Sequence, residues 1–132
     1  MGFRIDNAGT ISPNVIKTKV ASASGSTAVW TPVSGKRFRL MGYEIGATAN
    51  IATSSGGIIE AILLDSATAI GVGISFYAPS AAGSADGPND RIGPINIGDG
   101  VLSAADNNVL NVSLSAALSS GEIRVTVWGI EE

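Results

Sequence analysis

The stretch Ile123-Arg124-Val125-Thr126-Val127-Trp128 decides the fold class of this chain. Its aliphatic residues alternate strictly with polar or aromatic ones, which is the period of a β-strand with one buried and one mixed face. The same alternation recurs over Leu110–Ser115, and over Ile70–Phe76, where glycine occupies much of the opposite face. No segment of twelve or more residues keeps an apolar period of 3.6, so we expect strands and no helix.

Further strands are expected wherever short apolar runs lie between turn signals. They cover Val15–Val20, Thr27–Val33, Lys36–Ala47, Ile58–Leu64 and Ile92–Ile97. In Lys36–Ala47 the apolar face changes at Gly42, which predicts either a β-bulge or a crossing of the strand between faces. Pro32 and Pro94 place their strands at sheet edges or strand ends. About eight short strands without a helix predict an all-β fold, an antiparallel β-sandwich of jelly-roll type.

The length of 132 residues favours a single β-sandwich domain over residues 15–132. Residues 1–14 show no strand or helix period and are interpreted as an N-terminal arm. The arm carries Phe3 and Ile5, whereas a solvated tail keeps few apolar residues. We expect these two side chains to dock on a neighbouring subunit or a partner. A frayed terminus is the alternative.

The composition excludes several classes of function. The chain has neither Cys nor His, which removes thiolate and histidine catalysis and most transition-metal sites. A net charge of −3 and a pI of about 4.8 argue against nucleic acid as a partner. The longest apolar run, Ile58–Leu64, is too short to span a membrane, and residues 1–21 lack the pattern of a signal peptide. We expect no enzyme, no cofactor and no small-molecule substrate.

The surface of the protein is expected to be partly covered by other subunits. Charged residues make up only 14% of the chain and the mean hydropathy is +0.32. An isolated sandwich of this composition would expose apolar patches. The composition therefore predicts a homo-oligomer, for which we expect a trimer.

The stretch Gly35-Lys36-Arg37-Phe38-Arg39-Leu40-Met41-Gly42-Tyr43 follows a polar strand at 22–32 and precedes a closing strand at 121–129. Over residues 22–131 this pattern resembles small β-proteins encoded among the structural genes of tailed bacteriophages. The resemblance implies a capsid decoration (cement) protein, made in the host cytoplasm and bound to the outer capsid surface of the virion. Such a structural protein sits as a homotrimer and holds neighbouring subunits of the major capsid protein together.

Five charged or aromatic residues of the sandwich are candidates for contacts with the capsid or with another subunit. Lys36, Arg37 and Arg39 form a basic cluster that could pair with carboxylates of a partner. The alternative for this cluster is a solvated strand face or a set of charges that protects a sheet edge. Tyr77 and Trp128 are expected to be at least partly exposed.

Carbohydrate binding is the alternative function, as in a phage tail or baseplate protein that recognises the host surface. Trp30, Tyr43, Phe76, Tyr77 and Trp128 could form a platform on which sugars stack, although aromatic residues also pack in cores and interfaces.

Two pairs of carboxylates are candidates for a catalytic or a metal-binding site. Glu44 and Glu60 would lie together only if their strands paired, as a glycosidase would require. We interpret both as surface or interface residues. Asp86 and Asp90 supply oxygen ligands that suit calcium, but their loop lacks the spacing of a calcium-binding motif and is interpreted as a polar turn. No catalytic, cofactor-binding or metal-binding residue is predicted.

Overall fold

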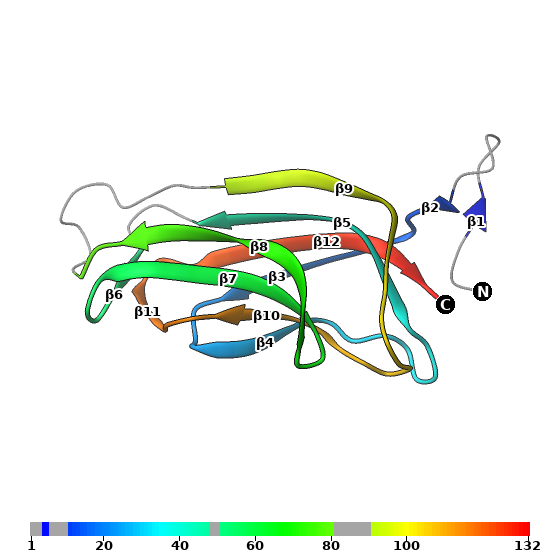
Figure 1. Ribbon diagram of the computed structural model, residues 1–132, viewed down its shortest axis with the longest axis horizontal. Coiled ribbons are helices and arrows are strands. Elements are labelled where there is room, and N and C mark those ends of the chain that lie inside the picture. The colour runs from blue at the N-terminus through cyan, green and yellow to red at the C-terminus, as the bar shows by residue number, and fades with distance from the viewer. Residues whose placement is uncertain (1–3, 6–10, 48–50, 81–90) are drawn as a thin grey trace.

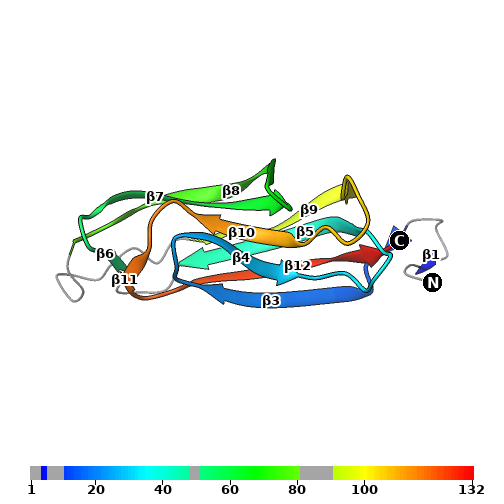
Figure 2. The ribbon, with the colours of Figure 1, turned by 90° about the horizontal axis from the view of Figure 1, so that it is seen from below.

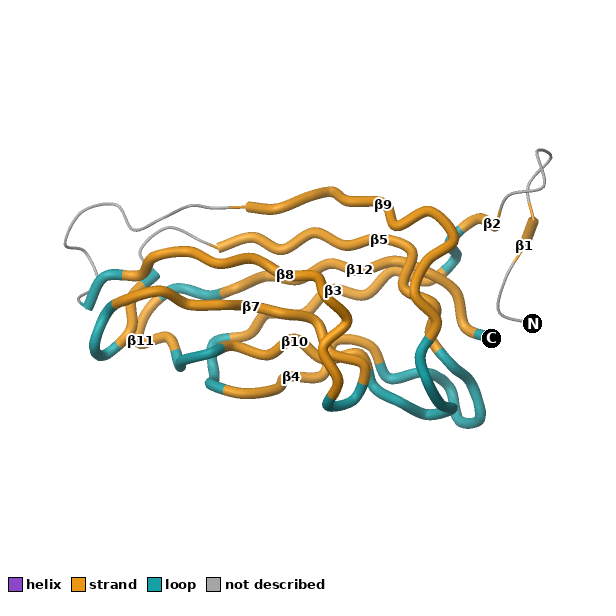
Figure 3. Tube along the Cα trace, viewed as in Figure 1, coloured by secondary structure: helices purple, strands orange, loops and turns teal. Residues whose placement is uncertain are grey.

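The computed structural model describes residues 4–5, 11–47, 51–80 and 91–132, and only the backbone of residues 4–5 and 11–12. This part of the chain consists of strands and loops without a helix (Figure 3). Its twelve strands are β1 (Arg4–Ile5), β2 (Ile11–Ser12), β3 (Val15–Ala21), β4 (Gly25–Trp30), β5 (Phe38–Ala47), β6 (Ala52–Thr53), β7 (Gly57–Asp65), β8 (Thr68–Ala78), β9 (Arg91–Leu102), β10 (Leu110–Leu114), β11 (Leu118–Ser120) and β12 (Ile123–Glu131).

Eight of these strands build two four-stranded antiparallel sheets, ordered β3-β12-β5-β9 and β4-β10-β7-β8, which form the two layers of a sandwich (Figures 1 and 2). In chain order these strands are β3, β4, β5, β7, β8, β9, β10 and β12. The first pairs with the last (β3 with β12), and the pairing continues inward with β4 and β10, β5 and β9, and finally β7 and β8. This is the pairing of one long hairpin rolled up on itself, which defines a jelly roll. The predicted all-β sandwich is confirmed, and the short pairs β1–β2 and β6–β11 lie outside its two sheets.

The core lies between the two sheets. Ile123, Val125 and Val127 of β12 are fully buried, whereas the residues between them face outward, as their alternation predicts. Burying an aliphatic side chain of this size contributes about 1.5–3 kcal/mol. Trp30 is also fully buried, and its Nε1 donates a hydrogen bond of 2.9 Å to Oε1 of Glu131. The core therefore accepts this indole without leaving its polar atom unsatisfied.

Strand β5 changes its buried face at a bulge. Phe38 and Leu40 point into the core before the change, and Tyr43 and Ile45 do so after it. Against β12, Leu40 pairs with Gly129 and the next pair is Gly42 with Trp128, which leaves Met41 as the extra residue. The extra residue shifts the alternation by one position. The bulge predicted at Gly42 is thus confirmed at Met41–Gly42.

The four edge strands of the sandwich are β3, β9, β4 and β8. Strand β9 contains a cis peptide bond between Gly93 and Pro94 and two shifts of its register with β5. Strand β4 ends at Trp30, shortly before Pro32. The edge positions predicted from these two prolines are confirmed. Strands β4, β8 and β9 each contain a register shift, whereas β3 pairs with β12 without one.

The N-terminal arm contains a hairpin that the sequence did not predict. Arg4 lies opposite Ser12 and Ile5 opposite Ile11, so β1 and β2 form a two-stranded sheet of their own. Strands of two residues each are too short to produce a detectable alternation. Phe3 and the side chain of Ile5 lie outside the described part of the chain, so their predicted docking stays a prediction.

Candidate binding surfaces

Trp128 lies flat on the outer face of the sheet β3-β12-β5-β9. A Cβ atom added at Gly42 would meet the indole ring of Trp128, so the glycine makes room for the ring. The indole Nε1 donates a hydrogen bond of 3.3 Å to Oδ1 of Asn96 on β9, which fixes the orientation of the ring. Trp128 is partly exposed, as predicted, and therefore presents aromatic surface on this face.

Strand β3 adds exposed aliphatic side chains to the same outer face. Ile16 lies opposite Trp128 and is 72% exposed, and Val20 lies opposite Arg124 and is 37% exposed. Between them, the hydroxyl groups of Thr18 and Thr126 are 3.2 Å apart. On this surface the two apolar side chains Ile16 and Val20 therefore lie on either side of the polar pair Thr18–Thr126.

The lysines of β3 point the other way, toward the inner side of the sheet. Lys17 lies opposite Val127 and Lys19 opposite Val125, and both valines are fully buried. Both lysines are nevertheless exposed, because β3 is an edge strand and long side chains reach past the edge of the core. In the middle of β3 the lysines are therefore on the inner side and the apolar Ile16 and Val20 face solvent, whereas Val15 and Ala21 at its two ends pack against the core.

The outer face of the other sheet carries an exposed apolar pair. Ile58 on β7 and Tyr77 on β8 lie directly opposite each other and are 67% and 59% exposed. The prediction that Tyr77 is exposed is confirmed. Large apolar side chains exposed side by side are a common feature of protein contact surfaces.

The basic cluster is used within the chain. Nε of Arg37 lies 3.1 Å from a carboxylate oxygen of Asp106, and Nε of Arg39 lies 2.7 Å from one of Glu132. The backbones of Arg37 and Glu132 also exchange hydrogen bonds of 2.8 and 2.9 Å. Lys36 is half-buried and has no ion pair in the part of the chain described here. Any partner carboxylate would have to compete with these internal contacts for the two arginines.

The fold does not bring together Glu44 and Glu60, the candidate glycosidase pair. Glu44 lies on β5 and Glu60 on β7, and these strands belong to different sheets. Both side chains face outward, on opposite sides of the sandwich, and Glu44 pairs with Arg91 at 2.9 Å.

The five aromatic residues do not form a common platform for sugars. Trp30, Tyr43 and Phe76 are core residues with at most 4% of their surface exposed. Tyr77 and Trp128 are exposed on the outer faces of different sheets. The sequence left core packing open as the alternative role of these aromatic residues, and it is the role of Trp30, Tyr43 and Phe76.

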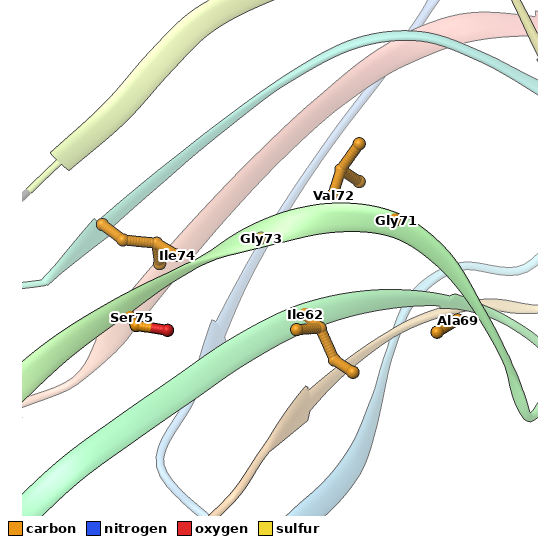
Figure 4. Close-up of a pocket in the computed structure, with 7 residues that line it drawn as sticks. All are labelled: Ile62, Ala69, Gly71, Val72, Gly73, Ile74 and Ser75. Atoms are coloured by element: carbon orange, nitrogen blue, oxygen red, sulfur yellow. The ribbon is translucent and has the colours of Figure 1, made fainter.

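An open groove of about 180 Å³ lies along β8 and the neighbouring β7 (Figure 4). Its lining consists of Ile62, Ala69, Gly71, Val72, Gly73, Ile74 and Ser75, none of which is charged. At Gly73, an added Cβ would meet the backbone of Ala61 and Ile62, so the two strands approach closely there. A side chain at position 73 would therefore clash with the neighbouring strand.

The residues that sequence analysis missed are Ile16, Lys17, Lys19, Val20 and Ile58. For β3, alternation alone shows that lysines and aliphatic residues lie on opposite faces, but it assigns the aliphatic face to the core. The pairing with β12 is what reverses this assignment. The exposure of Ile58 could have been predicted from its strand, which is apolar on both faces. Only one face of a strand in a two-layer sandwich meets the core, so the other apolar face must lie outside.

In the residues that the structure describes, no group of His, Cys, Asp and Glu side chains could hold a metal ion. Asp86 and Asp90 lie outside these residues. Within the same residues no helix is long and apolar enough to cross a membrane. A comparison of the chain with family models, curated proteins and solved structures finds no match.

Proposed function

We propose that this chain is a structural protein of a tailed-phage virion, bound to the outer surface of the capsid. It holds neighbouring subunits of the major capsid protein together and has no catalytic role. The resemblance of residues 22–131 to phage structural proteins suggests this function, and the jelly-roll sandwich is consistent with it.

The observation that carries the proposal is the exposed apolar pair Ile58–Tyr77, which lies on the outer face of the sheet β4-β10-β7-β8. Both residues lie on paired strands, so little backbone freedom is lost when a partner covers them. An interface of standard size buries about 1,600 Å² in total, and several such contacts made by one oligomer add up through avidity. The mechanism is mechanical: each bound copy raises the barrier to separation of the capsid subunits beneath it.

Sedimentation of the purified protein with empty capsids tests the proposal. The wild-type protein should pellet with the capsids, and mass spectrometry of purified virions should find the chain at high copy number. Replacing the pair by serine (I58S with Y77S) should weaken capsid binding by about tenfold or more, and should lower the stability only by the roughly 0.2–1 kcal/mol of one cross-strand pair. Val33→Ser is the matched control, because Val33 is 66% exposed but lies outside both sheets. A wild-type protein that stays in the supernatant would contradict the proposed function.

A carbohydrate-binding role is supported by a different observation, the indole of Trp128 lying over Gly42 and held by Asn96. An aromatic ring that lies flat on a sheet can stack against the apolar face of a sugar, and the neighbouring threonines can donate hydrogen bonds. Binding on a glycan array that is lost in Trp128→Ala would favour this second function over the first.

A further inference from the structure

We propose that the free edge of β3 accepts an extended segment of a partner protein whose sequence alternates acidic and apolar residues. The segment would add as a further strand to the sheet β3-β12-β5-β9. This inference goes beyond the proposed function, because it defines the partner by its chemistry and does not require the partner to be a capsid protein.

The backbone of β3 is the most regular of the four sheet edges. All seven of its residues pair with β12 in one uninterrupted register. Strands β4, β8 and β9 each contain a register shift, and β9 also contains Pro94. Bulges and prolines prevent another strand from pairing with an edge. The edge of β3 has neither, and its residues 16–20 are all exposed.

Among the residues that the structure describes, the protection on this edge is electrostatic. Lys17 and Lys19 point to the inner side of the sheet, two positions apart. Neither has an ion pair in the described part of the chain, whereas Arg37, Arg39 and Arg91 each lie 2.7–3.1 Å from a carboxylate. Two cations without a carboxylate partner among the described residues are a local exception on an otherwise acidic protein, and they favour an anionic partner.

These charges select which strand can be added. A second copy that paired through its own β3 would bring lysine next to lysine, and like charges on opposed residues are destabilising. A strand with carboxylates at alternate positions would instead meet Lys17 and Lys19 with opposite charge. Its intervening residues would lie on the outer face beside Ile16 and Val20, which are exposed and apolar. Main-chain hydrogen bonds would then supply affinity, and the alternation would supply specificity.

Two synthetic peptides test the inference on the full-length protein: Val-Glu-Val-Glu-Val-Glu-Val and its lysine counterpart, both with blocked ends. At low ionic strength the wild-type protein should bind the glutamate peptide about tenfold more tightly than the lysine peptide, or better. Binding should slow hydrogen exchange of those alternate amides of Val15–Ala21 that point away from β12, and leave the other edge strands unchanged. The double variant Lys17→Glu with Lys19→Glu should reverse the preference, and Lys17→Gln with Lys19→Gln should abolish it.

Lys36→Glu is the control for a change of charge elsewhere, because Lys36 lies in a turn remote in sequence from β3 and should leave the preference intact. The inference is overturned if the wild-type protein binds neither peptide, if it binds both equally, or if the glutamate variant keeps the wild-type preference. These outcomes are separate from the proposed function. A protein that binds the glutamate peptide but not capsids would keep this inference and remove the capsid proposal, and the reverse result would do the opposite.

Discussion

Single contacts at the residue scale decide how the outer surface of this sandwich is built. Gly42 sits at the bulge of β5, directly under the indole of Trp128, so the absence of a side chain there is a packing requirement. Gly46 lies four residues further along the same strand, and nothing approaches the position of its missing Cβ atom. Packing therefore requires a glycine at position 42 of this strand but not at position 46.

Gly42→Ala should destabilise the protein by about 1–3 kcal/mol, because the new methyl group forces the indole off the sheet. The fluorescence of Trp128 should shift to the red as the ring enters water, while Trp30 remains buried. Denaturant unfolding and emission spectra measure the two effects. Gly46→Ala is the matched control and should be neutral or slightly stabilising. Equal stability of the two variants would contradict the packing role of Gly42.

A second residue-scale contact fixes the end of the sandwich. Asp65, at the end of β7, is buried and accepts three hydrogen bonds. They come from the hydroxyl of Ser103 at 2.9 Å, the backbone N–H of Ala104 at 2.7 Å and the side-chain amide of Asn108 at 3.0 Å. One carboxylate therefore anchors the connection between β9 and β10 to the hairpin between β7 and β8.

Asp65→Ala should lower the free energy of unfolding by about 3 kcal/mol or more, since it leaves several donors without an acceptor. The control is Asp106→Ala, which removes an exposed ion pair with Arg37 and should cost about 1 kcal/mol or less. Urea unfolding of both variants checks the difference. A loss at Asp65 no larger than that at Asp106 would show that the network does not stabilise the fold.

At the scale of elements, the N-terminal arm and the sandwich are separate pairing units. In the described residues, β1 and β2 pair with each other and with no strand of the two main sheets. At the end of the arm, the backbone N–H of Asn14 donates a hydrogen bond of 3.0 Å to the carbonyl of Gly129 on β12. A deletion that stops before this residue leaves that anchor in place.

Deletion of residues 2–12 should therefore leave the melting temperature of the free protein nearly unchanged. If Phe3 and Ile5 dock on a partner, the same deletion should weaken capsid binding by about tenfold or more. Calorimetry and capsid sedimentation of the truncated protein measure the two effects. A truncated protein that fails to fold, or that binds capsids as tightly as the full chain, would refute this role of the arm.

For the molecule as a whole, the composition and the exposed apolar side chains both favour the predicted self-association. Six large apolar side chains remain at least 37% exposed in the described residues: Ile16, Val20, Val33, Ile58, Tyr77 and Leu102. Together with the low content of charged residues, they leave a surface with few groups that keep copies apart.

Analytical ultracentrifugation should find a homo-oligomer, for which we expect a trimer. Raising the salt concentration should not dissociate it, because contacts between apolar groups are not screened. A monomer at tens of micromolar would contradict the prediction for the free protein. Cross-linking of capsid-bound protein would then test whether the trimer forms only on the capsid.

Alternation was enough to place the eight strands of the two main sheets, because it is a local property of the backbone and is carried by neighbouring residues such as Ile123, Val125 and Val127. It also located the bulge of β5, since a change of buried face needs one extra residue. Which strands become neighbours was decided by tertiary structure, through contacts between residues far apart in the chain. That pairing separates Glu44 from Glu60, joins Arg39 to Glu132 and turns the lysines of β3 inward. Alternation tells which residues share a face, but only the paired strand tells which face meets the core.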